Sequence, residues 1–541
     1  MIRSIYYNGR VYTGELPLRQ AFAVEDGRFL RVGGDEELLA LAREGDALVD
    51  LGGRFVCAGF NDSHMHLLNY GQALRTARLE EHTASLAQLL AYLRAYLREQ
   101  NARGGQWLIG RGWNQDDFSD TRRMPDRRDL DAVSADVPIL ITRVCGHCCA
   151  VNSRALALAG IGPDTPDPAG GRIGRENGQP DGLLYDNAMD LLNGALPVPD
   201  KEEIKDMLRL ACARLNRYGV TSAQTDDYFL FPSVPFETVN AAFRELEAAG
   251  ELSVRIYEQS FFTSPERLRR FVETGNVTGA GSDRFRIGPL KLVADGALGS
   301  RTAHLSLPYA DGGDDCGFSL LSEKELDELI SFAHAHGMQI AVHAIGDACL
   351  DRVLDAVERA LRAQPRADHR HGVVHCQVTR PDQLERIRRL GMHVYAQSIF
   401  LDSDIRIVRR LLRPELAESS YCWKTLLRSG VCVSNGSDCP VELPDVMAGI
   451  QCAVTRRALD GTGPYLPQEA FTVQEALDSY TVHGAQASFE EDRKGRIREG
   501  FLADFVILGE DPFRCAPDRL RGIPVLATYL DGACVYRAPD A

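Results

Sequence analysis

The stretch GGRFVCAGFNDSHMH, residues 52–66, is a short apolar run that ends in aspartate and histidine. Seven later strand-like runs follow it, most of them preceded by a helix: VTSAQT (220–225), VRIYEQSF (254–261), FRIGPLKLVADG (285–296), MQIAVHAIGD (338–347), GVVHCQ (372–377), HVYAQS (393–398) and VCVSNGSD (431–438). Alternating strands and helices with short loops predict a parallel sheet, and eight such units predict a (β/α)8 TIM-like barrel over residues 56–485.

The two ends of the chain have a different style from the middle. Residues 1–55 contain IYYNGRVY and AFAVEDGRFLRV, in which Asn-Gly and Asp-Gly favour tight hairpin turns between short strands. Residues 486–541 return to this style with ADFVILGED and ATYLDGACVYR. Neither end has enough strands to bury a core alone. We therefore expect one small β-sandwich built from both termini.

One connection is too long for the barrel pattern. Between His66 and Val220 lie roughly 150 residues, far more than a simple loop needs. They include the helical SLAQLLAYLRAYLREQ (85–100) and the strand-like QWLIGRGW and VPILITRVCGH. This pattern predicts an inserted subdomain over about residues 70–185, above the barrel mouth.

Composition limits the partners of the protein. A net charge of −15 argues against a nucleic-acid partner, which needs concentrated Lys and Arg. No stretch approaches the ~18 apolar residues of a membrane helix, and the N-terminus has no signal-peptide pattern. We expect a cytoplasmic protein with reduced cysteines, including the cluster Cys145, Cys148 and Cys149. The oligomeric state stays open, with a homodimer as one option.

Candidate metal ligands follow several of the predicted strands. His64 and His66 are two residues apart, so on a strand both imidazoles face the same side and can bind one ion. Such a pair is weak by itself, because histidines on a strand face are often ordinary hydrogen-bonded residues. However, His343, His375 and Asp438 also end predicted strands. Barrel enzymes place their chemistry at this end, so chance is a poor explanation.

Lys291 lies inside the apolar strand IGPLKLVADG, where a buried ammonium among cations would be strongly disfavoured. It can form a salt bridge to a nearby acid such as Asp295, or it can face outward. A third interpretation is reaction with CO₂, which gives a carbamate anion able to bridge two cations.

The ordered set of His64, His66, Lys291, His343, His375 and Asp438 resembles the binuclear metal site of the amidohydrolase superfamily. The resemblance is closest to the YtcJ-like amidohydrolases, which include N-substituted formamide deformylases, and it covers nearly the whole chain. The runs that carry it are AGFNDSHMHL, GHCCAVNSRALALAGI, KLVADGALGSRTAHLSLPY, VHAIGD, GSDCPV and GRIREGFLADFVIL. One departure is Val374, where relatives often have a glutamate before the ligand histidine.

The resemblance implies a divalent metal cofactor, zinc being expected, with one or two ions per chain. His64 and His66 would bind the more buried ion, and His343 and His375 the more exposed one. Lys291, N6-carboxylated, would bridge them.

Asp438 is the implied catalytic residue. It would contact the buried ion, take a proton from water and pass it to the departing nitrogen. The resulting reading is a metal-dependent hydrolase of a non-peptide C–N bond in a small amide-like substrate. A deaminase, an ester, lactone or phosphotriester hydrolase, and a metal-free structural relative are the alternatives, and Lys291 disfavours the mononuclear deaminases.

Three residues are candidate substrate contacts, each with a structural alternative. Trp113 either lines the pocket or belongs to the subdomain core. His147 either polarises a substrate oxygen or is a hydrogen-bonded structural residue. Arg301 either binds a carboxylate or braces its own loop.

Overall fold

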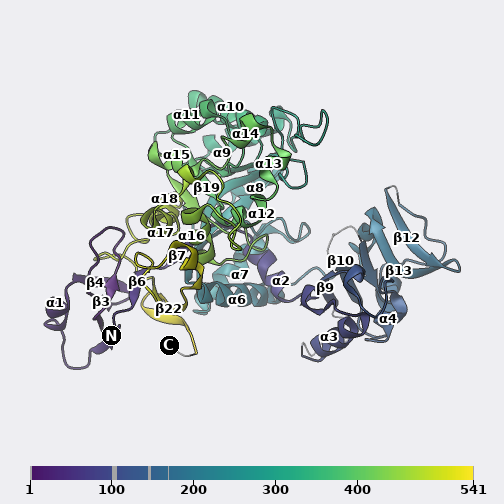
Figure 1. Ribbon diagram of the computed structural model, residues 1–541, viewed down its shortest axis with the longest axis horizontal. Coiled ribbons are helices and arrows are strands. Elements are labelled where there is room, and N and C mark those ends of the chain that lie inside the picture. Colours follow the sequence, from purple (N-terminus) through teal and green to yellow (C-terminus); the bar gives the residue numbers. More distant parts are fainter. Residues whose placement is uncertain (1–2, 100–106, 144–147, 169, 540–541) are drawn as a thin grey trace. The chain divides into compact units, whose positions relative to one another are not determined.

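A computed structural model of the chain describes residues 3–99, 107–143, 148–168 and 170–539 (Figure 1). The chain divides into two compact units, one formed by Met1–Gly71 with Ile204–Ala541 and the other by Gln72–Glu203. Within the described ranges, every helix is too short or too polar to cross a bilayer. The first unit holds a barrel and a sandwich, and the second holds the insertion.

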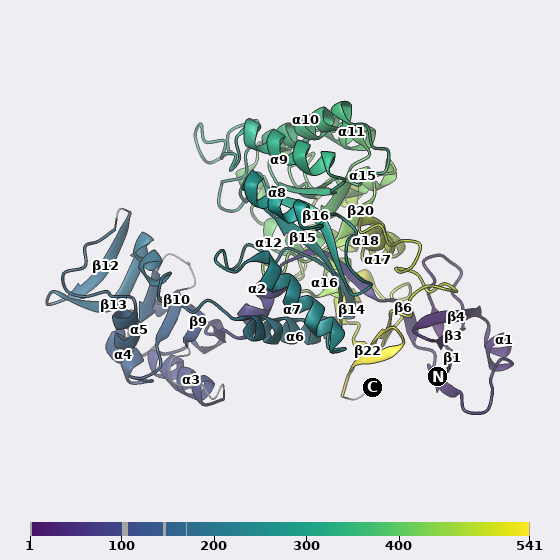
Figure 2. The ribbon, with the colours of Figure 1, turned by 180° about the vertical axis from the view of Figure 1, so that it is seen from behind.

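The eight predicted barrel strands are all present, and they pair in parallel in one sheet. Figure 2 shows β14, β15 and β16 side by side within it. In sheet order the strands are β20 (Val433–Asn435), β19 (His393–Ala396), β18 (Gly372–His375), β17 (Ile340–Ala344), β16 (Phe285–Val293), β15 (Arg255–Phe261), β14 (Val220–Thr225) and β7 (Phe60–Met65). The predicted TIM-like barrel is therefore confirmed.

The barrel closes through the residues that follow β20. Asp438 N donates to His64 O and His66 N donates to Cys439 O, both at 2.8 Å. The buried Asp62 reinforces this join, because its Oδ1 accepts from Ser437 N at 3.0 Å. The last gap in the sheet is thus closed by the backbone of three candidate metal ligands, which fixes their positions relative to one another.

Helices follow most of the barrel strands. Their bounds are α6 (Lys201–Arg217), α7 (Phe236–Ala248), α8 (Pro265–Glu273), α9 (Glu323–Ala335), α10 (Asp347–Ala363), α11 (Pro381–Leu390), α15 (Trp423–Arg428), α16 (Val446–Thr455) and α17 (Val473–Ser479). Local sequence explains their ends. Ser322 and Glu325 form a capping box at the start of α9, and Gly391 ends α11 in the left-handed region.

Helix α18 (Val482–Ala487) lies against the amino ends of the strands. Gly484 O accepts from Gln224 Nε2 at 2.9 Å, and Ala487 O accepts from Gln339 Nε2 at 3.0 Å. Ala487 also packs in a buried cluster with Val374 of β18 and Tyr395 of β19. Side chains of the barrel interior therefore pack against α18 at this end, and the candidate metal ligands lie at the other.

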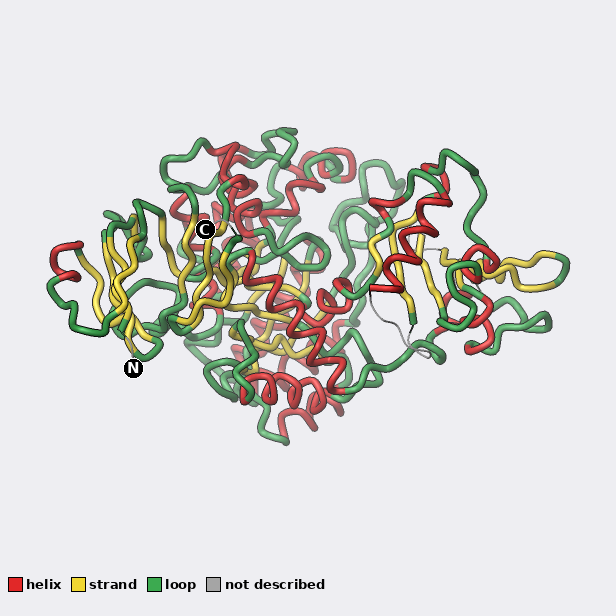
Figure 3. The backbone as a smooth tube through the Cα atoms, turned by 90° about the horizontal axis from the view of Figure 1, so that it is seen from below, coloured by secondary structure: helices red, strands yellow, loops and turns green. Residues whose placement is uncertain are grey.

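The sandwich is built from both termini, as predicted. One sheet has the order β4 (Arg28–Gly33), β3 (Ala21–Glu25), β1 (Ser4–Tyr7), β5 (Ala47–Asp50), and the other β2 (Arg10–Val11), β6 (Phe55–Ala58), β21 (Phe505–Leu508), β22 (Val525–Leu530), β23 (Ala533–Arg537). Aromatic rings fill the space between the sheets. Tyr6 stacks on Phe22 at 4.7 Å, and Phe505 stacks on Tyr529 at 4.3 Å. Figure 3 places both chain ends beside these strands.

The run that opens the barrel forms two strands, whereas the sequence predicts one. Residues 52–64 look like a single strand, but the structure divides them at Gly59 into β6 of the sandwich and β7 of the barrel. A Cβ at Gly59 would lie 2.2 Å from Thr221 Oγ1. Only glycine lets the chain pass so close to β14 while it changes sheets.

The insertion has its own sheet, ordered β12 (Gly171–Glu176), β13 (Gln179–Asp186), β11 (Cys148–Val151), β10 (Ile139–Arg143), β9 (Leu108–Trp113), β8 (Ala77–Arg78). Three α-helices accompany it: α3 (Leu86–Glu99), α4 (Arg127–Asp131) and α5 (Ser153–Leu158). The compact unit continues to Glu203, and η3 (Asn187–Leu192) contributes Ala188 and Leu192 to its core. It therefore has a hydrophobic core independent of the barrel.

Candidate metal centre

The structure brings the candidate ligand side chains together at the carboxyl ends of the strands. The facing nitrogen and oxygen atoms of His64, His375 and Asp438 all lie within 4.8 Å of one another. The ring of His66 is centred 5.2 Å from His64, and the ring of His343 is centred 4.4 Å from His375. Ligands that are far apart in the sequence thus surround one small volume.

Two buried glutamines determine which ring nitrogen of His64 and of His375 carries the hydrogen. Gln259 Oε1 lies 2.7 Å from His64 Nδ1, and Gln397 Oε1 lies 2.8 Å from His375 Nδ1. An amide oxygen only accepts, so each Nδ1 must be the donor. In a neutral imidazole the Nε2 atom is then a bare lone pair, and in both rings it is free to bind a cation.

Backbone carbonyl oxygens bond to one ring nitrogen of each of the other two histidines. His66 Nδ1 lies 3.3 Å from Asp226 O, and its Nε2 faces Asp438 Oδ1. His343 uses the opposite nitrogen, since its Nε2 lies 3.1 Å from Gly296 O and its Nδ1 is left bare. All four rings therefore have one nitrogen held by an amide or backbone oxygen.

Asp438 faces two of these rings. Its Oδ1 is 3.3 Å from His64 Nε2 and 3.0 Å from His66 Nε2. Burial lowers the pKa of His64 to about 4, so this ring is neutral at pH 7. Burial opposes a charge on His66, but its hydrogen bond to Asp438 outweighs burial and raises the pKa of that ring. The two Nε2 atoms thus meet one carboxylate oxygen, where a cation can take the place of a proton. Imidazole and carboxylate are ligands that zinc and similar metals accept, so the donor set fits a divalent ion.

Lys291 is buried and faces the centre, and its carboxylate neighbour is Asp226, with Nζ 3.9 Å from Oδ2. Asp295 is not its partner, because the two oxygens of Asp295 accept from the backbone of Ile345, Gly346 and His304. Burial lowers the pKa of Lys291. Asp226 Oδ1 is buried without a hydrogen-bond partner, a second sign that positive charge is missing here.

Two of the candidate ligands, His375 and Asp438, have strained backbone conformations. His375, Cys376 and Asp438 have φ values of 75°, 49° and 57°, in the left-handed region that residues other than glycine rarely adopt. The indole of Trp423 in α15 stabilises the first two, since Nε1 donates to His375 O at 3.0 Å and to Cys376 O at 3.1 Å. This strain is maintained where the ligand side chains must point inward.

Comparison with known proteins gives the family. The amidohydrolase family matches residues 47–536. The putative amidohydrolase YtcJ of Bacillus subtilis (strain 168) is 34% identical over 99% of both chains. The chain belongs to the amidohydrolase family.

Two further relatives agree with this placement. An N-substituted formamide deformylase of Arthrobacter pascens is 31% identical over 96% of this chain and 95% of its own. The crystal structure of an uncharacterized metal-dependent hydrolase from Pyrococcus furiosus has a TM-score of 0.78 and 29% identity, covering 95% of this chain and 100% of that one. Sequence and fold thus point to the same family of hydrolases over nearly full length.

In this amidohydrolase, two of the three predicted substrate contacts lie where their structural alternatives are favoured. Trp113 is fully buried in the core of the insertion, where its Nε1 donates to Ile141 O at 3.1 Å, which favours the core alternative. Arg301 pairs with Asp311 of its own loop at 2.6 Å, which favours the brace. His147 lies outside the described residues. The substrate roles of these residues stay predictions.

Val374, where relatives often have a glutamate, packs in an apolar cluster. It is fully buried against Ala341, Tyr395 and Ala487. An ionised glutamate there would enter an apolar cluster without a charge partner among these three side chains, so valine suits this barrel. The ligand His375 takes its hydrogen-bond partner from Gln397 instead.

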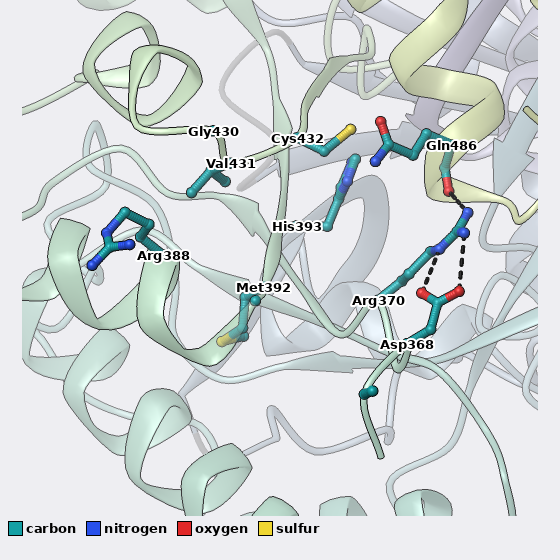
Figure 4. A pocket seen from close by; sticks show the side chains of 11 residues that line it. Asp368, Arg370, Arg388, Met392, His393, Gly430, Val431, Cys432 and Gln486 are labelled. Atoms are coloured by element: carbon teal, nitrogen blue, oxygen red, sulfur yellow. Dashed lines mark hydrogen bonds and ion pairs between the residues drawn. The ribbon is translucent and has the colours of Figure 1, made fainter.

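A pocket at the opposite end of the barrel does not compete with this centre (Figure 4). It lies at the amino ends of β18, β19 and β20, and Arg370 and His393 line it. Arg370 is neutralised by Asp368 and Glu491, and His393 Nε2 bonds to Ser434 Oγ at 2.8 Å. No unbalanced charge from these residues converges there, unlike at the metal centre.

Sequence reasoning missed the residues that orient the ligands, namely Gln259, Gln397, Asp226 and Trp423. The two glutamines lie near the ends of two of the predicted strand runs, Gln259 in VRIYEQSF and Gln397 in HVYAQS. That position, set beside the histidines at equivalent strand ends, was the available signal.

Proposed function

We propose that this amidohydrolase is a metal-dependent hydrolase that cleaves a carbon–nitrogen bond outside peptides, in an amide or an N-formyl or N-acyl amine. The observation that carries the proposal is the convergence of the Nε2 atoms of His64 and His66 on Asp438 Oδ1. The name of the Arthrobacter pascens relative, an N-substituted formamide deformylase, supports the choice of bond.

The metal would be held by His64, His66, His343, His375 and Asp438, with zinc favoured by the imidazole-rich set. When bound, divalent ions of this kind lower the pKa of water and polarise a carbonyl. The protein's part is to keep the ring nitrogens aimed, through Gln259, Gln397 and the carbonyls of Asp226 and Gly296.

Lys291 would be carboxylated and would bridge two ions. Its buried position favours the neutral amine, which is the nucleophile that CO₂ requires. The lone pair of Nζ forms a bond to the carbon of CO₂, one proton leaves the nitrogen, and the product is a carbamate anion. That anion would place negative charge at the centre, where two cations would otherwise repel each other.

Asp438 would act as the base and then the acid of the reaction. Its Oδ1 is directed at His64 and His66, which leaves Oδ2 to take a proton from water. Delivery of that proton to the nitrogen is needed because an amine anion is a poor leaving group. An ester needs no such delivery, so this role favours an amide substrate.

Two measurements test the proposal. Plasma emission on the purified protein should find one or two divalent ions per chain. The metal-loaded protein should hydrolyse members of a panel of N-formyl and N-acyl amines, lose this activity with a chelator and regain it with zinc. Matched esters, lactones and phosphotriesters serve as the comparison. Metal-free protein, or turnover of the esters alone, would contradict the proposal.

A further inference from the structure

We propose that Gln259 and Gln397 are paired positioning residues, each of which fixes one ligand histidine in the Nδ1–H form and aims its Nε2 at the metal. The proposal rests on the proposed function, because it concerns the same centre. It adds that neutral amides, and not carboxylates, do this work on the two opposing rings.

Each glutamine is held in one orientation by its own amide nitrogen. Gln259 Nε2 donates to Ser63 O at 3.1 Å, and Gln397 Nε2 donates to Tyr395 O at 3.0 Å. Rotating either amide by 180° would place its oxygen against that carbonyl oxygen, so the flipped form loses the bond to the backbone and sets two acceptors against each other. The oxygen must therefore face the histidine, and the tautomer of the ring follows from the backbone.

The two glutamines act from different sides of the centre. Gln259 belongs to β15 and reaches past β14 to His64 on β7, whereas Gln397 follows β19 and contacts His375 on the adjacent β18. Both side chains are fully buried. The rings that they hold are centred 5.8 Å apart and belong to the tightest group of ligand atoms in the described chain.

The neutral charge of the amide has a chemical consequence. A carboxylate in the same place would accept the same hydrogen bond, but it would make the imidazole more basic and the centre more negative. Asp438 and Asp226 already supply negative charge within this volume. An amide orients the ring without this added charge, so the ion keeps more of its power to acidify water.

Four variants and one control test the proposal. Gln259→Met and Gln397→Met keep the side-chain length but remove the acceptor. Gln259→Glu and Gln397→Glu keep the acceptor and add charge. The control is Gln339→Met, because Gln339 is an equally buried glutamine of the same barrel that bonds to Arg370 O, Ala487 O and Tyr257. Its hydrogen-bond partners include no ligand histidine.

Zinc affinity, measured by competition with a chelator, is the main readout. Each methionine variant should bind zinc about 10–100-fold more weakly, while Gln339→Met should bind it as the wild type does. The glutamate variants should retain zinc, and the rising limb of their pH–rate profile should move to higher pH. The glutamate variants preserve shape, so they remain informative if a methionine variant does not fold.

The outcomes separate this proposal from the one on which it rests. Wild-type protein without metal would overturn the proposed function. Wild-type protein with metal, together with methionine variants of unchanged affinity, would overturn only the role of the glutamines. Equal loss in Gln339→Met would also overturn it, because the effect would then be one of general stability.

Discussion

Histidines gather at both ends of the barrel, and β18 has one at each end. His375 closes the strand at the metal centre, and His371 precedes it at the amino end. At the amino end ring nitrogens bond to one another or to fixed acceptors. His334 joins His371 at 2.8 Å and Gln364 O at 2.7 Å, and His369 joins Leu390 O at 2.8 Å.

The metal centre differs in where the second nitrogen of each histidine ring points. Each of its rings has one nitrogen bonded to an amide or backbone oxygen, and the Nε2 atoms of His64 and His66 converge on the carboxylate of Asp438. His371 Nδ1 has no hydrogen-bond partner, but among the described residues His371 belongs to no cluster of potential metal ligands. The comparison teaches that a metal site is defined by ring nitrogens and a carboxylate oxygen that face one another. The number of histidines alone does not define it.

The strongest way to break the comparison is to remove a pair of histidines from each end. His64→Ala with His66→Ala should abolish binding of the buried ion, because two of its nitrogens are lost. His369→Ala with His371→Ala should keep the full metal content and lose only stability. Plasma emission on folded protein measures both. Unchanged metal in the first variant would refute the ligand assignment.

Asp438→Asn tests the carboxylate that faces the histidines of the metal centre. The amide keeps the size of the side chain but cannot take a proton, so kcat should fall by at least ~10² with the melting temperature nearly unchanged. If Asp438 were simply a helix cap, the cost would be about 0.5–2 kcal/mol of stability with chemistry largely intact. Near wild-type kcat in the metal-loaded variant would falsify the proposed role.

Lys291→Met sharpens the comparison between functional and structural buried lysines. It should lose metal and activity, because methionine cannot form the carbamate. Lys494→Met is the matched control, because Lys494 is also buried but pairs with Glu490 away from the centre. That variant should keep its metal while its thermal stability falls. Full metal content in Lys291→Met would exclude a bridging carbamate.

The smallest expected effect is at the amino end and depends on pH. Burial lowers the pKa of His393 from 6.5 to about 3, so the folded protein holds this ring neutral while the unfolded chain protonates it. Its contribution to stability is therefore present above pH 6.5 and is lost as the pH falls toward 3. Urea midpoints measured between pH 7 and pH 4 should fall less steeply in His393→Asn than in wild type.

Much of the fold was predictable because its signals are local. Each barrel strand is a short run bounded by turn residues, and ligand histidines end three of them. Trp113 was harder to place. In β9, simple alternation from the buried Leu108 would turn Trp113 outward, but Gly112 has a φ of 105° and the register shifts beside it, so the indole enters the core.

The residues that orient the ligands depend on distant pairing. Gln259 reaches His64 only because β15, β14 and β7 are neighbours in that order, and Asp226 meets Lys291 only across the barrel interior. Sequence spacing identifies which residues end a strand. It does not tell which side chain from another strand will meet them, because that requires the closed barrel.

The sandwich has a consequence for how the protein is made. Strand β6 leaves the ribosome early, yet β21, which pairs with it from Phe505↔Ala58 to Leu508↔Phe55, is nearly the last part to be translated. At about 5–20 residues per second, the first strands wait between about 20 and 90 seconds for their partner. During that time one side of β6 is an open edge, a site for mispairing with other nascent chains. All the barrel strands are therefore translated while the sandwich still lacks β21.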